Sequence, residues 1–164
     1  MHKKIMFPNP DMKFDNYVVV HPVYGGEKQV LLGLSDDEFC QWVINNDASI
    51  TDRLNCVTIE EEDWPIDHTF VDAWEPADGQ VIVNMGKARR VYLDRDIRPV
   101  RNAELAAKDI TFMRAVEAGD TDAQAAIATE KQALRDIPQT FNLTARTPSQ
   151  LKSLWPPELP PRTS

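Results

Sequence analysis

The stretch LAAKDITFMRAVEAGDTDAQAAIATEKQALRDI, residues 105–137, decides the fold of the second half of this chain. Apolar residues recur there at the spacing of one helix face, and they include Leu105, Ile110, Ala115 and Val116 before Gly119, and Ile127, Leu134 and Ile137 after it. Gly119 is typical of the residue that ends a helix, and Thr121 with Gln124 fits a capping box that begins the next one. Two helices joined by so short a turn pack antiparallel, so the stretch predicts a helical hairpin.

The helical pattern extends beyond this stretch in both directions. It begins near Met85 and continues to Pro138, where we expect the second helix to end. Pro99 lies inside the pattern. Because proline lacks an N–H and crowds the preceding turn, we expect a kink or a break there.

The last part of the chain predicts a short helix followed by an extended arm. Thr147 and Pro148 fit an N-cap and a first helical residue, and the proline-rich run at residues 156–161 predicts a polyproline-type arm. The predicted organisation therefore has three parts, which are an acidic mixed α/β domain (1–84), a helical hairpin (85–138), and a short helix with a proline-rich arm (139–164).

The first half of the chain predicts short strands and turns. Runs of β-branched and apolar residues indicate strands, at Tyr17–Val20, Gln29–Leu32 and Cys56–Ile59. Residues 70–74 and 80–83 flank Asp78 and Gly79, which is the signal of a β-hairpin. With the hairpin helices that follow, this pattern predicts an α+β fold with a small strand-rich N-terminal domain.

A short helix is also predicted in the first half. Ser35 and Glu38 fit a capping box, and the helix that follows has Phe39, Val43 and Ile44 on one side. Cys40 lies on the same apolar side, and Cys56 opens a strand-like run. Two cysteines are too few for a disulfide scaffold, so we expect two buried reduced thiols.

Composition and charge exclude several classes of function. The chain has 164 residues and a net charge of −8, and residues 1–85 hold 5 lysines and arginines against 16 aspartates and glutamates. An acidic chain repels phosphate backbones and anionic lipids, so we expect neither a nucleic acid nor a membrane as partner. No run approaches the roughly 18 apolar residues of a membrane span, and no secretory signal is recognisable at the start. The composition is typical of a soluble intracellular protein.

The sequence offers little that would support catalysis. The acidic run Glu60–Asp63 contains no glycine, unlike a calcium-binding loop, and is best interpreted as a solvated charged face. Asp67 and His68 could form an oriented imidazole, but no nucleophile motif or phosphate-binding loop accompanies them. We therefore expect no enzyme activity, no catalytic residue, no metal and no cofactor.

Two other clusters point to protein–protein contact. The cations Arg90, Arg95, Arg98 and Arg101 form either a solvated helix face, paired with Asp94 at i,i+4 spacing, or an electrostatic docking surface. Trp155 stands beside the proline arm, and it either folds back on the hairpin or anchors a partner, since aromatic residues are enriched at interface hot spots. An apolar partner-binding surface is expected at Phe112, Met113, Leu134, Leu151, Leu154, Trp155 and Pro156.

Several segments resemble small proteins of tailed bacteriophages. The order of residues 34–39 (LSDDEF) and 64–74 (WPIDHTFVDAW) is similar to that in those proteins, where a segment P-x-D-x-T-F-x-x-A-W, matched here by residues 65–74, precedes a long helix. Later segments resemble the helical-hairpin region and closing Trp-Pro of phage tail assembly chaperones, and tail-fibre assembly proteins share that ending; these segments are 109–115, 131–138 and 154–156. The resemblance covers roughly residues 34–157, so most of the chain after its first 33 residues.

The resemblance implies a non-enzymatic protein that engages a phage tail or tail-fibre subunit during virion assembly in the host cytoplasm. It implies no cofactor and no catalytic residue. Our first hypothesis is an assembly chaperone that shields a sticky surface of that subunit. Two alternatives stay open, a structural virion component such as a tail adaptor or fibre-attachment protein, and an inhibitor of a host protein. Homo-oligomerisation and retention in the virion are also left open.

Overall fold

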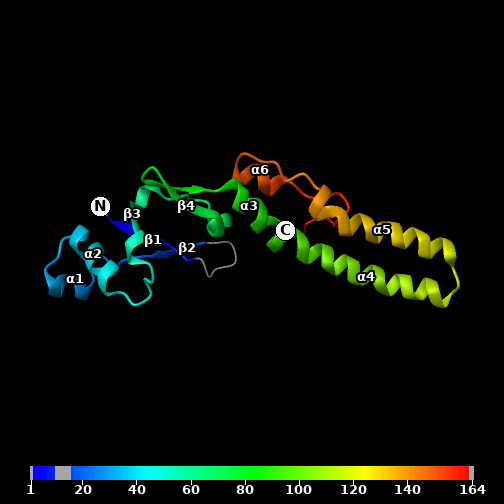
Figure 1. Cartoon of the computed structure of the whole chain (residues 1–164), viewed down its shortest axis with the longest axis horizontal. Helices are drawn as coiled ribbons and strands as arrows, with labels where there is room; N and C mark the ends of the chain where they lie inside the picture. The colour runs from blue at the N-terminus through cyan, green and yellow to red at the C-terminus, as the bar shows by residue number, and fades with distance from the viewer. Residues whose placement is uncertain (1, 10–15, 163–164) are drawn as a thin grey trace. The chain divides into compact units, whose positions relative to one another are not determined.

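The computed structural model describes residues 2–9 and 16–162, and Figure 1 shows their helices and strands. The chain forms two compact units, an N-terminal unit of residues 1–88 and a C-terminal unit of residues 89–164. Small antiparallel sheets belong to the first unit and a long helical hairpin to the second, so the predicted α+β class is confirmed. In the described part of the chain, no helix has both the length and the hydropathy that crossing a membrane requires.

A three-stranded antiparallel sheet forms the centre of the N-terminal unit. β1 (Lys3–Pro8) lies between β2 (Tyr17–Val20) and β3 (Val57–Glu60). Successive residues of a strand point to opposite faces of its sheet, and both faces of β1 are covered. Ile5 packs in one hydrophobic cluster and Met6 in the other. The sheet is therefore a central layer between two cores, and the predicted strand at Tyr17–Val20 is confirmed.

The segment Gln29–Leu32 is helical, so the prediction of a strand there is wrong. It belongs to α1 (Glu27–Leu32), which ends at Gly33 in the left-handed conformation, with φ of 64°. The side chain of Gln29 closes the turn before the helix, because its Oε1 accepts from the N–H of Gly25 (2.7 Å). These local hydrogen bonds outweigh the strand preference of a four-residue apolar run.

The helix α2 (Asp36–Asn46) begins at the predicted capping box. The backbone N–H of Ser35 donates to Glu38 Oε2 (2.9 Å), and the N–H of Glu38 donates to Ser35 Oγ (3.4 Å). Hydrogen bonds from the Ser35 side chain and backbone hold the pKa of Glu38 below its usual range. The helix buries the predicted face, which is Phe39, Cys40, Val43 and Ile44.

A two-stranded hairpin, β4 (Trp74–Ala77) and β5 (Gln80–Val83), completes the strands of this unit. Its turn has positive φ at both central residues, 50° at Asp78 and 81° at Gly79, which is the geometry of a type I′ turn. The predicted hairpin is confirmed, but it starts at Trp74 because the preceding residues form the 3-10 segment η3 (His68–Ala73). Two shorter 3-10 turns flank β3, η1 (Arg53–Asn55) and η2 (Glu61–Asp63).

The helical half begins with α3 (Met85–Tyr92) and continues into α4 (Arg98–Glu117). Between them lies one wide π-helical turn, η4 (Leu93–Ile97). Pro99 follows this turn after one residue and is the second residue of α4. Proline removes a donor and crowds the preceding turn, and a π-helical turn is a known way to accommodate such an irregularity. The predicted interruption near Pro99 thus takes the form of a widened turn.

The turn of the hairpin is a full Schellman motif. Gly119 has φ of 68°, its N–H donates to Val116 O (3.0 Å), and the N–H of Asp120 donates to Ala115 O (3.0 Å). The next helix, α5 (Thr121–Thr140), is capped by the side chain of Asp120, which accepts from the N–H of Ala123 (2.9 Å). The predicted capping box at Thr121 is therefore wrong by one residue.

The end of α5 also differs from the prediction. The helix continues past Pro138 to residue 140, because Pro138 lies in the last turn and removes only one hydrogen bond while Leu134 and Ile137 remain packed. A short helix, α6 (Pro148–Ser153), follows as predicted, with Thr147 Oγ1 accepting from the N–H of Gln150 (3.2 Å). Residues 154–162 then run without helix or strand.

Candidate functional site

The predicted partner-binding residues all lie in the C-terminal unit. One of them, Leu134, belongs to the seam, which is the buried contact between α4 and α5. Ala115 of α4 and Ile127, Leu134 and Ile137 of α5 are the buried residues of the two helices. Leu134 is therefore part of the seam between the helices. Its prediction as a partner-binding residue is corrected, because in this fold its side chain is covered by the chain itself.

Phe112 is half-buried beside the same seam. The ammonium of Lys131 lies 5.1 Å from the centre of the Phe112 ring and also pairs with Asp109. A second ion pair, Lys108 with Glu130, joins the helices at the same level, one residue away on each helix. Exposed pairs of this kind contribute roughly 0–1 kcal/mol, so they fix the register of the two helices more than they stabilise them. Phe112 is therefore only partly accessible to a partner, because it is half-buried and the Lys131 ammonium lies over its ring.

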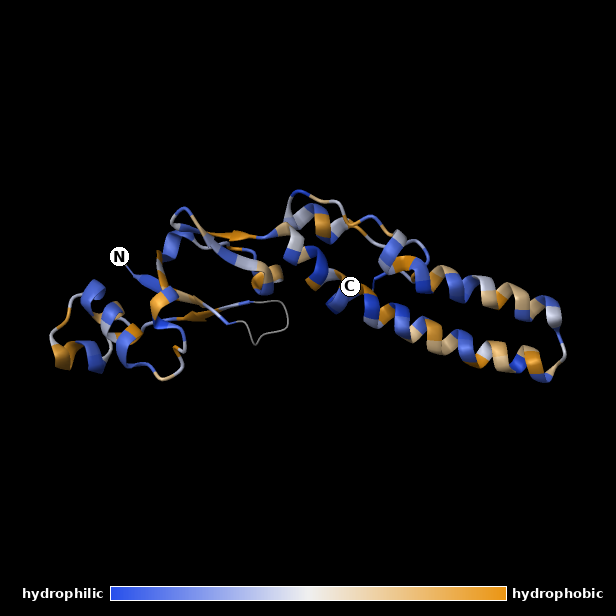
Figure 2. Cartoon of the chain, in the orientation of Figure 1, coloured by the Kyte–Doolittle hydropathy of each residue, from blue (hydrophilic) through white to orange (hydrophobic). Residues whose placement is uncertain are grey.

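A row of exposed apolar side chains on α4 is the main apolar surface of the hairpin. Ile110, Met113 and Val116 have exposed fractions of 58%, 57% and 44%. Their i, i+3, i+6 spacing places them in one continuous band on the helix, which we call the α4 row. Figure 2 shows apolar segments recurring along the whole of α4. Met113 was predicted as a site residue. Ile110 and Val116 were assigned only to the helix pattern, although their spacing from Met113 was visible in the sequence.

The C-terminal arm is packed on its own unit. Leu151 and Pro156 have almost no exposed surface, and Leu159 is buried as well. The hydroxyl of Tyr92 donates to Leu154 O (2.5 Å), which ties the segment after α6 to the helix α3. Leu151 and Pro156 are thus core residues, and their prediction as partner-binding residues is corrected. A two-helix hairpin has a narrow core, and the arm supplies the apolar groups that close its base.

Trp155 folds back on its own unit, which is the first of the two alternatives that the sequence left open. Its indole Nε1–H donates to Pro160 O (2.9 Å), and the guanidinium of Arg162 lies 4.6 Å from its ring centre and 5.3 Å from that of Tyr92. Arg162 also donates to Leu154 O (3.0 Å). This stacked arrangement, the arm clasp, holds Trp155 half-buried. No sequence pattern connects Arg162 with Trp155, because their contact depends on how the arm turns back.

An open cavity lies beside the arm clasp. It has a volume of about 450 Å³, and its lining includes Pro99 and Val100 of α4 with Trp155 and Pro161 of the arm. Arg95 also lines it. One face of the Trp155 region therefore stays accessible, so this residue remains a candidate for partner contact in spite of its packing.

The four predicted docking arginines do not form one concentrated positive surface. Arg98 pairs with Asp94, and Arg95 pairs with Asp96 (3.1 Å). Arg101 donates to the side chain of Asn102 (2.8 Å), whereas Arg90 is exposed on α3. The pairing favours a solvated helix face over an electrostatic docking surface.

Three groups that could take part in chemistry, Asp67, His68 and Cys40, make structural contacts in this fold. Asp67 Oδ1 accepts from the N–H of Thr69 (2.9 Å) and caps η3, while the His68 ring lies edge-on to Trp74, with 5.1 Å between ring centres. Burial raises the pKa of the Cys40 thiol, which keeps it protonated at neutral pH. Among residues 2–9 and 16–162, no three histidine, cysteine, aspartate or glutamate side chains meet as a metal site would require.

Comparison with protein-family models, with curated proteins and with solved structures found no match to this chain. The candidate surface is therefore identified from the geometry of the molecule alone. Its candidate functional surface is the α4 row, bordered by Phe112 at the seam, with the cavity beside Trp155 as a second accessible apolar region in the same unit.

Proposed function

We propose that this protein is a non-enzymatic bacteriophage tail or tail-fibre assembly chaperone, which binds a tail subunit through the α4 row and keeps it soluble until assembly. The observation that supports the proposal is the exposure of Ile110, Met113 and Val116 on a helix whose other face already packs on α5. The resemblance of residues 109–115, 131–138 and 154–156 to tail assembly chaperones supplies the class of partner.

The proposed mechanism is burial of apolar surface. Each Å² of apolar surface that leaves water contributes about 25 cal/mol, and contiguous exposed apolar side chains are typical of protein interaction sites. A helix of the partner can lie along the α4 row in the way that a third helix completes a bundle. The acidic N-terminal unit, with 5 basic against 16 acidic residues over 1–85, repels other copies and keeps the complex in solution.

The first experiment measures binding to a purified tail or tail-fibre subunit of the same phage by size-exclusion chromatography and calorimetry. The test variant is Ile110→Ser with Met113→Ser, which removes two of the three side chains of the α4 row without touching the seam. The matched control is Ile66→Ser, which removes an almost fully exposed isoleucine from the N-terminal unit. We expect the double variant to lose at least about tenfold in affinity, as hot-spot truncations do, and the control to bind like the wild type.

The second experiment is mass spectrometry of purified virions. A chaperone leaves before the particle is complete, so we expect the protein in lysates together with the tail subunit and not in finished particles. Stoichiometric presence in virions would contradict the chaperone role and favour the structural virion component. Equal affinity of the double variant and the wild type would contradict the role of the α4 row.

A further inference from the structure

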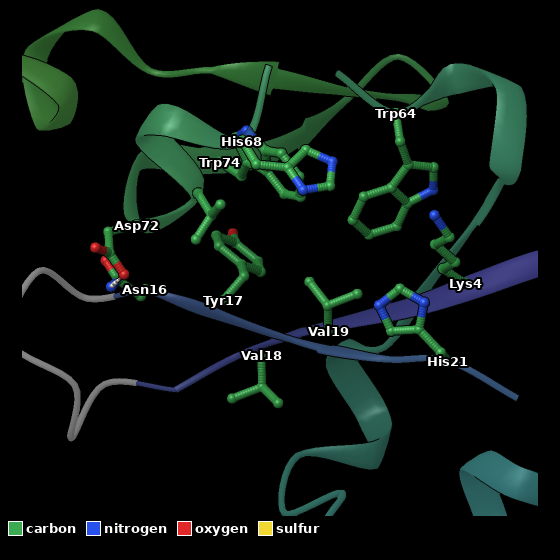
Figure 3. A pocket seen from close by; sticks show the side chains of 11 residues that line it. Lys4, Asn16, Tyr17, Val18, Val19, His21, Trp64, His68, Asp72 and Trp74 are labelled. Carbon is green, nitrogen blue, oxygen red and sulfur yellow. Dashed lines mark hydrogen bonds between the residues drawn. The ribbon is translucent and has the colours of Figure 1, made fainter. Parts of the chain in front are cut away.

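The N-terminal unit has a binding feature that the proposed function does not use. A cavity of about 370 Å³ lies over one face of β2, and Figure 3 shows the side chains that line it. Tyr17 and Val19 form its floor, and the lining of the opposite side includes Trp64, His68 and Trp74. Cavities of this size with mostly apolar and aromatic walls and a few polar groups are typical of ligand sites.

Two residues that line this cavity each have a buried polar atom without a hydrogen-bond partner in the described part of the chain. Asn16 is 4% exposed and Trp74 is 7% exposed, and neither Asn16 Oδ1 nor Trp74 Nε1 has a hydrogen-bond partner among the described residues. Asn16 Nδ2 donates to Asp72 Oδ1 (3.1 Å), which fixes the amide so that its oxygen is the free end. Buried groups without partners are costly. These two groups show that the wall of the cavity is incompletely hydrogen-bonded, although neither atom has exposed surface that a ligand could contact.

The strand below the cavity has an open edge. β2 pairs with β1 on one side and is the outer strand of its sheet. The N–H of Asn9 donates to Asn16 O (2.8 Å), and hydrogen-bonded pairs alternate along an antiparallel ladder. The residues of β2 that bond to β1 are therefore Val18 and Val20, opposite Phe7 and Ile5.

It follows that the backbone groups of Tyr17 and Val19 point away from β1. No hydrogen bond from described residues satisfies them. The side chains of these same two residues form the floor of the cavity. The free backbone groups and the cavity thus belong to the same residues, so one extended chain can engage both.

We infer that the N-terminal unit binds an extended segment of another polypeptide, which adds to the open edge of β2 and inserts an uncharged apolar or aromatic side chain between Val19 and the two tryptophans. Strand addition supplies backbone hydrogen bonds, and pockets for alternate side chains supply specificity. An aromatic residue fits best because it stacks on Trp64, Trp74 and Tyr17. This surface is separate from the α4 row, so it stands or falls independently of the proposed function.

The probe is a synthetic peptide, acetyl-TVTFTVT-amide, added to the full-length protein. Two control probes separate the parts of the inference. The first is the same peptide with N-methyl groups on alternate backbone amides, which cannot donate to a strand. The second is N-acetylphenylalanine amide, which has the side chain without the strand. Binding is followed by the fluorescence of the tryptophans and by NMR amide exchange.

We expect the unmodified peptide to bind and to slow exchange of the Tyr17 and Val19 amides, which in the free protein exchange faster than those of Val18 and Val20. We expect the N-methylated peptide to bind about tenfold more weakly, since it loses at least one or two hydrogen bonds. If N-acetylphenylalanine amide binds as tightly as the peptide and protects neither amide, the cavity is a small-molecule site and the inference is wrong. No binding at about 1 mM peptide, a very weak affinity limit, also overturns it.

Two protein variants test the same surface. Val19→Pro removes the outward N–H and keeps the ladder to β1, since edge positions tolerate proline. Val71→Trp fills the cavity from its rim, and its matched control is Ile82→Trp, because Val71 and Ile82 are both 44% exposed and only Val71 lines the cavity. We expect the first two variants to lose peptide binding and the control to keep it. If Val71→Trp, folded as judged by its melting temperature, binds like the control, the inference is wrong.

Discussion

β1 and α4 show two ways of burying a segment. β1 has six residues, of which Ile5, Met6 and Phe7 are consecutive and buried, because a sheet strand in the middle of a unit is covered on both faces. α4 has 20 residues and buries only Ala115, because a single partner helix covers one narrow stripe. A strand between two cores leaves no apolar surface for other molecules, whereas a helix in a two-helix hairpin leaves a large part of its circumference available.

The largest effect is expected from the strand that is covered on both faces. Phe7→Ala removes a ring that is 1% exposed and packs against α2. We expect the free energy of unfolding of the N-terminal unit to fall by about 3–5 kcal/mol. Chemical denaturation followed by tryptophan fluorescence measures this, because Trp42, Trp64 and Trp74 all lie in that unit. A loss below about 1 kcal/mol, the size of an ordinary point substitution, would show that β1 is less tightly packed than we describe.

A slightly smaller effect is expected in the C-terminal unit at Leu151. This leucine is fully buried and joins the arm to the hairpin, so Leu151→Ala should cost about 2–5 kcal/mol. The matched control is Leu154→Ala in the same segment, where the side chain is half-buried. NMR amide exchange of α5 separates the two variants. Equal protection of α5 in both would mean that the arm does not support the hairpin.

The thermal stability of the hairpin should depend on the backbone conformation of Gly119 in its turn. A Cβ on Gly119 would meet no atom within 4 Å, but φ is 68°, a conformation that L side chains rarely adopt. Gly119→Ala is therefore expected to cost about 1–2 kcal/mol, measured as a shift in melting temperature. Gly119→Asn is the control, because asparagine tolerates the left-handed region better. Identical melting of both variants would contradict the strained-turn explanation.

Acid stability should depend on Glu75 in the N-terminal unit. Burial acts to raise its pKa, but the hydrogen bonds from Lys87 and Asn84 outweigh burial and lower it below the usual 4.5. A lowered carboxyl pKa stabilises the fold above about pH 4.5, and this contribution is lost as the pH falls through the folded-state value. We expect Glu75→Gln to have a lower free energy of unfolding than the wild type at pH 7. Below about pH 4 the difference in this free energy between the two proteins should become smaller. A constant difference across this range would contradict the ion pair with Lys87.

The smallest effect is expected on the α4 row. Met113→Ser changes an exposed side chain, so the free energy of unfolding should change by no more than about 0.5 kcal/mol. Thermal unfolding measures this directly. A larger loss would mean that Met113 contributes to the packing of the hairpin, and that the row is less available to partners than its exposure indicates.

The parts of the fold that could be predicted from the sequence are those decided by neighbouring residues. Gly119 and the apolar spacing on either side of it are enough for the hairpin, and Asp78 with Gly79 is enough for the type I′ turn. The helix at Gln29–Leu32 could not be predicted, because hydrogen bonds of the Gln29 side chain decide it. Local patterns fail where a side chain reaches back to a particular backbone group.

The candidate site was predictable only in part, for a related reason. Periodicity shows that Met113 and Leu134 are apolar helix positions. It does not show which side of each helix is covered by the other helix of the hairpin. Leu151 and Pro156 look equally available in the sequence, and they become buried only because the arm turns back. The guanidinium of Arg162 lies over the rings of both Tyr92 and Trp155 where the arm turns back. Tyr92 is distant from the other two residues in the sequence, and no motif links the three.

The exposure of Met113 has a chemical consequence. Met6 is fully shielded in the sheet, whereas more than half of the Met113 side chain is in contact with solvent. A peroxide would therefore convert Met113 to its sulfoxide well before it reaches Met6, and a sulfoxide is polar where the thioether was not. Oxidation during storage would thus place a polar group in the middle of the α4 row while the fold stays intact.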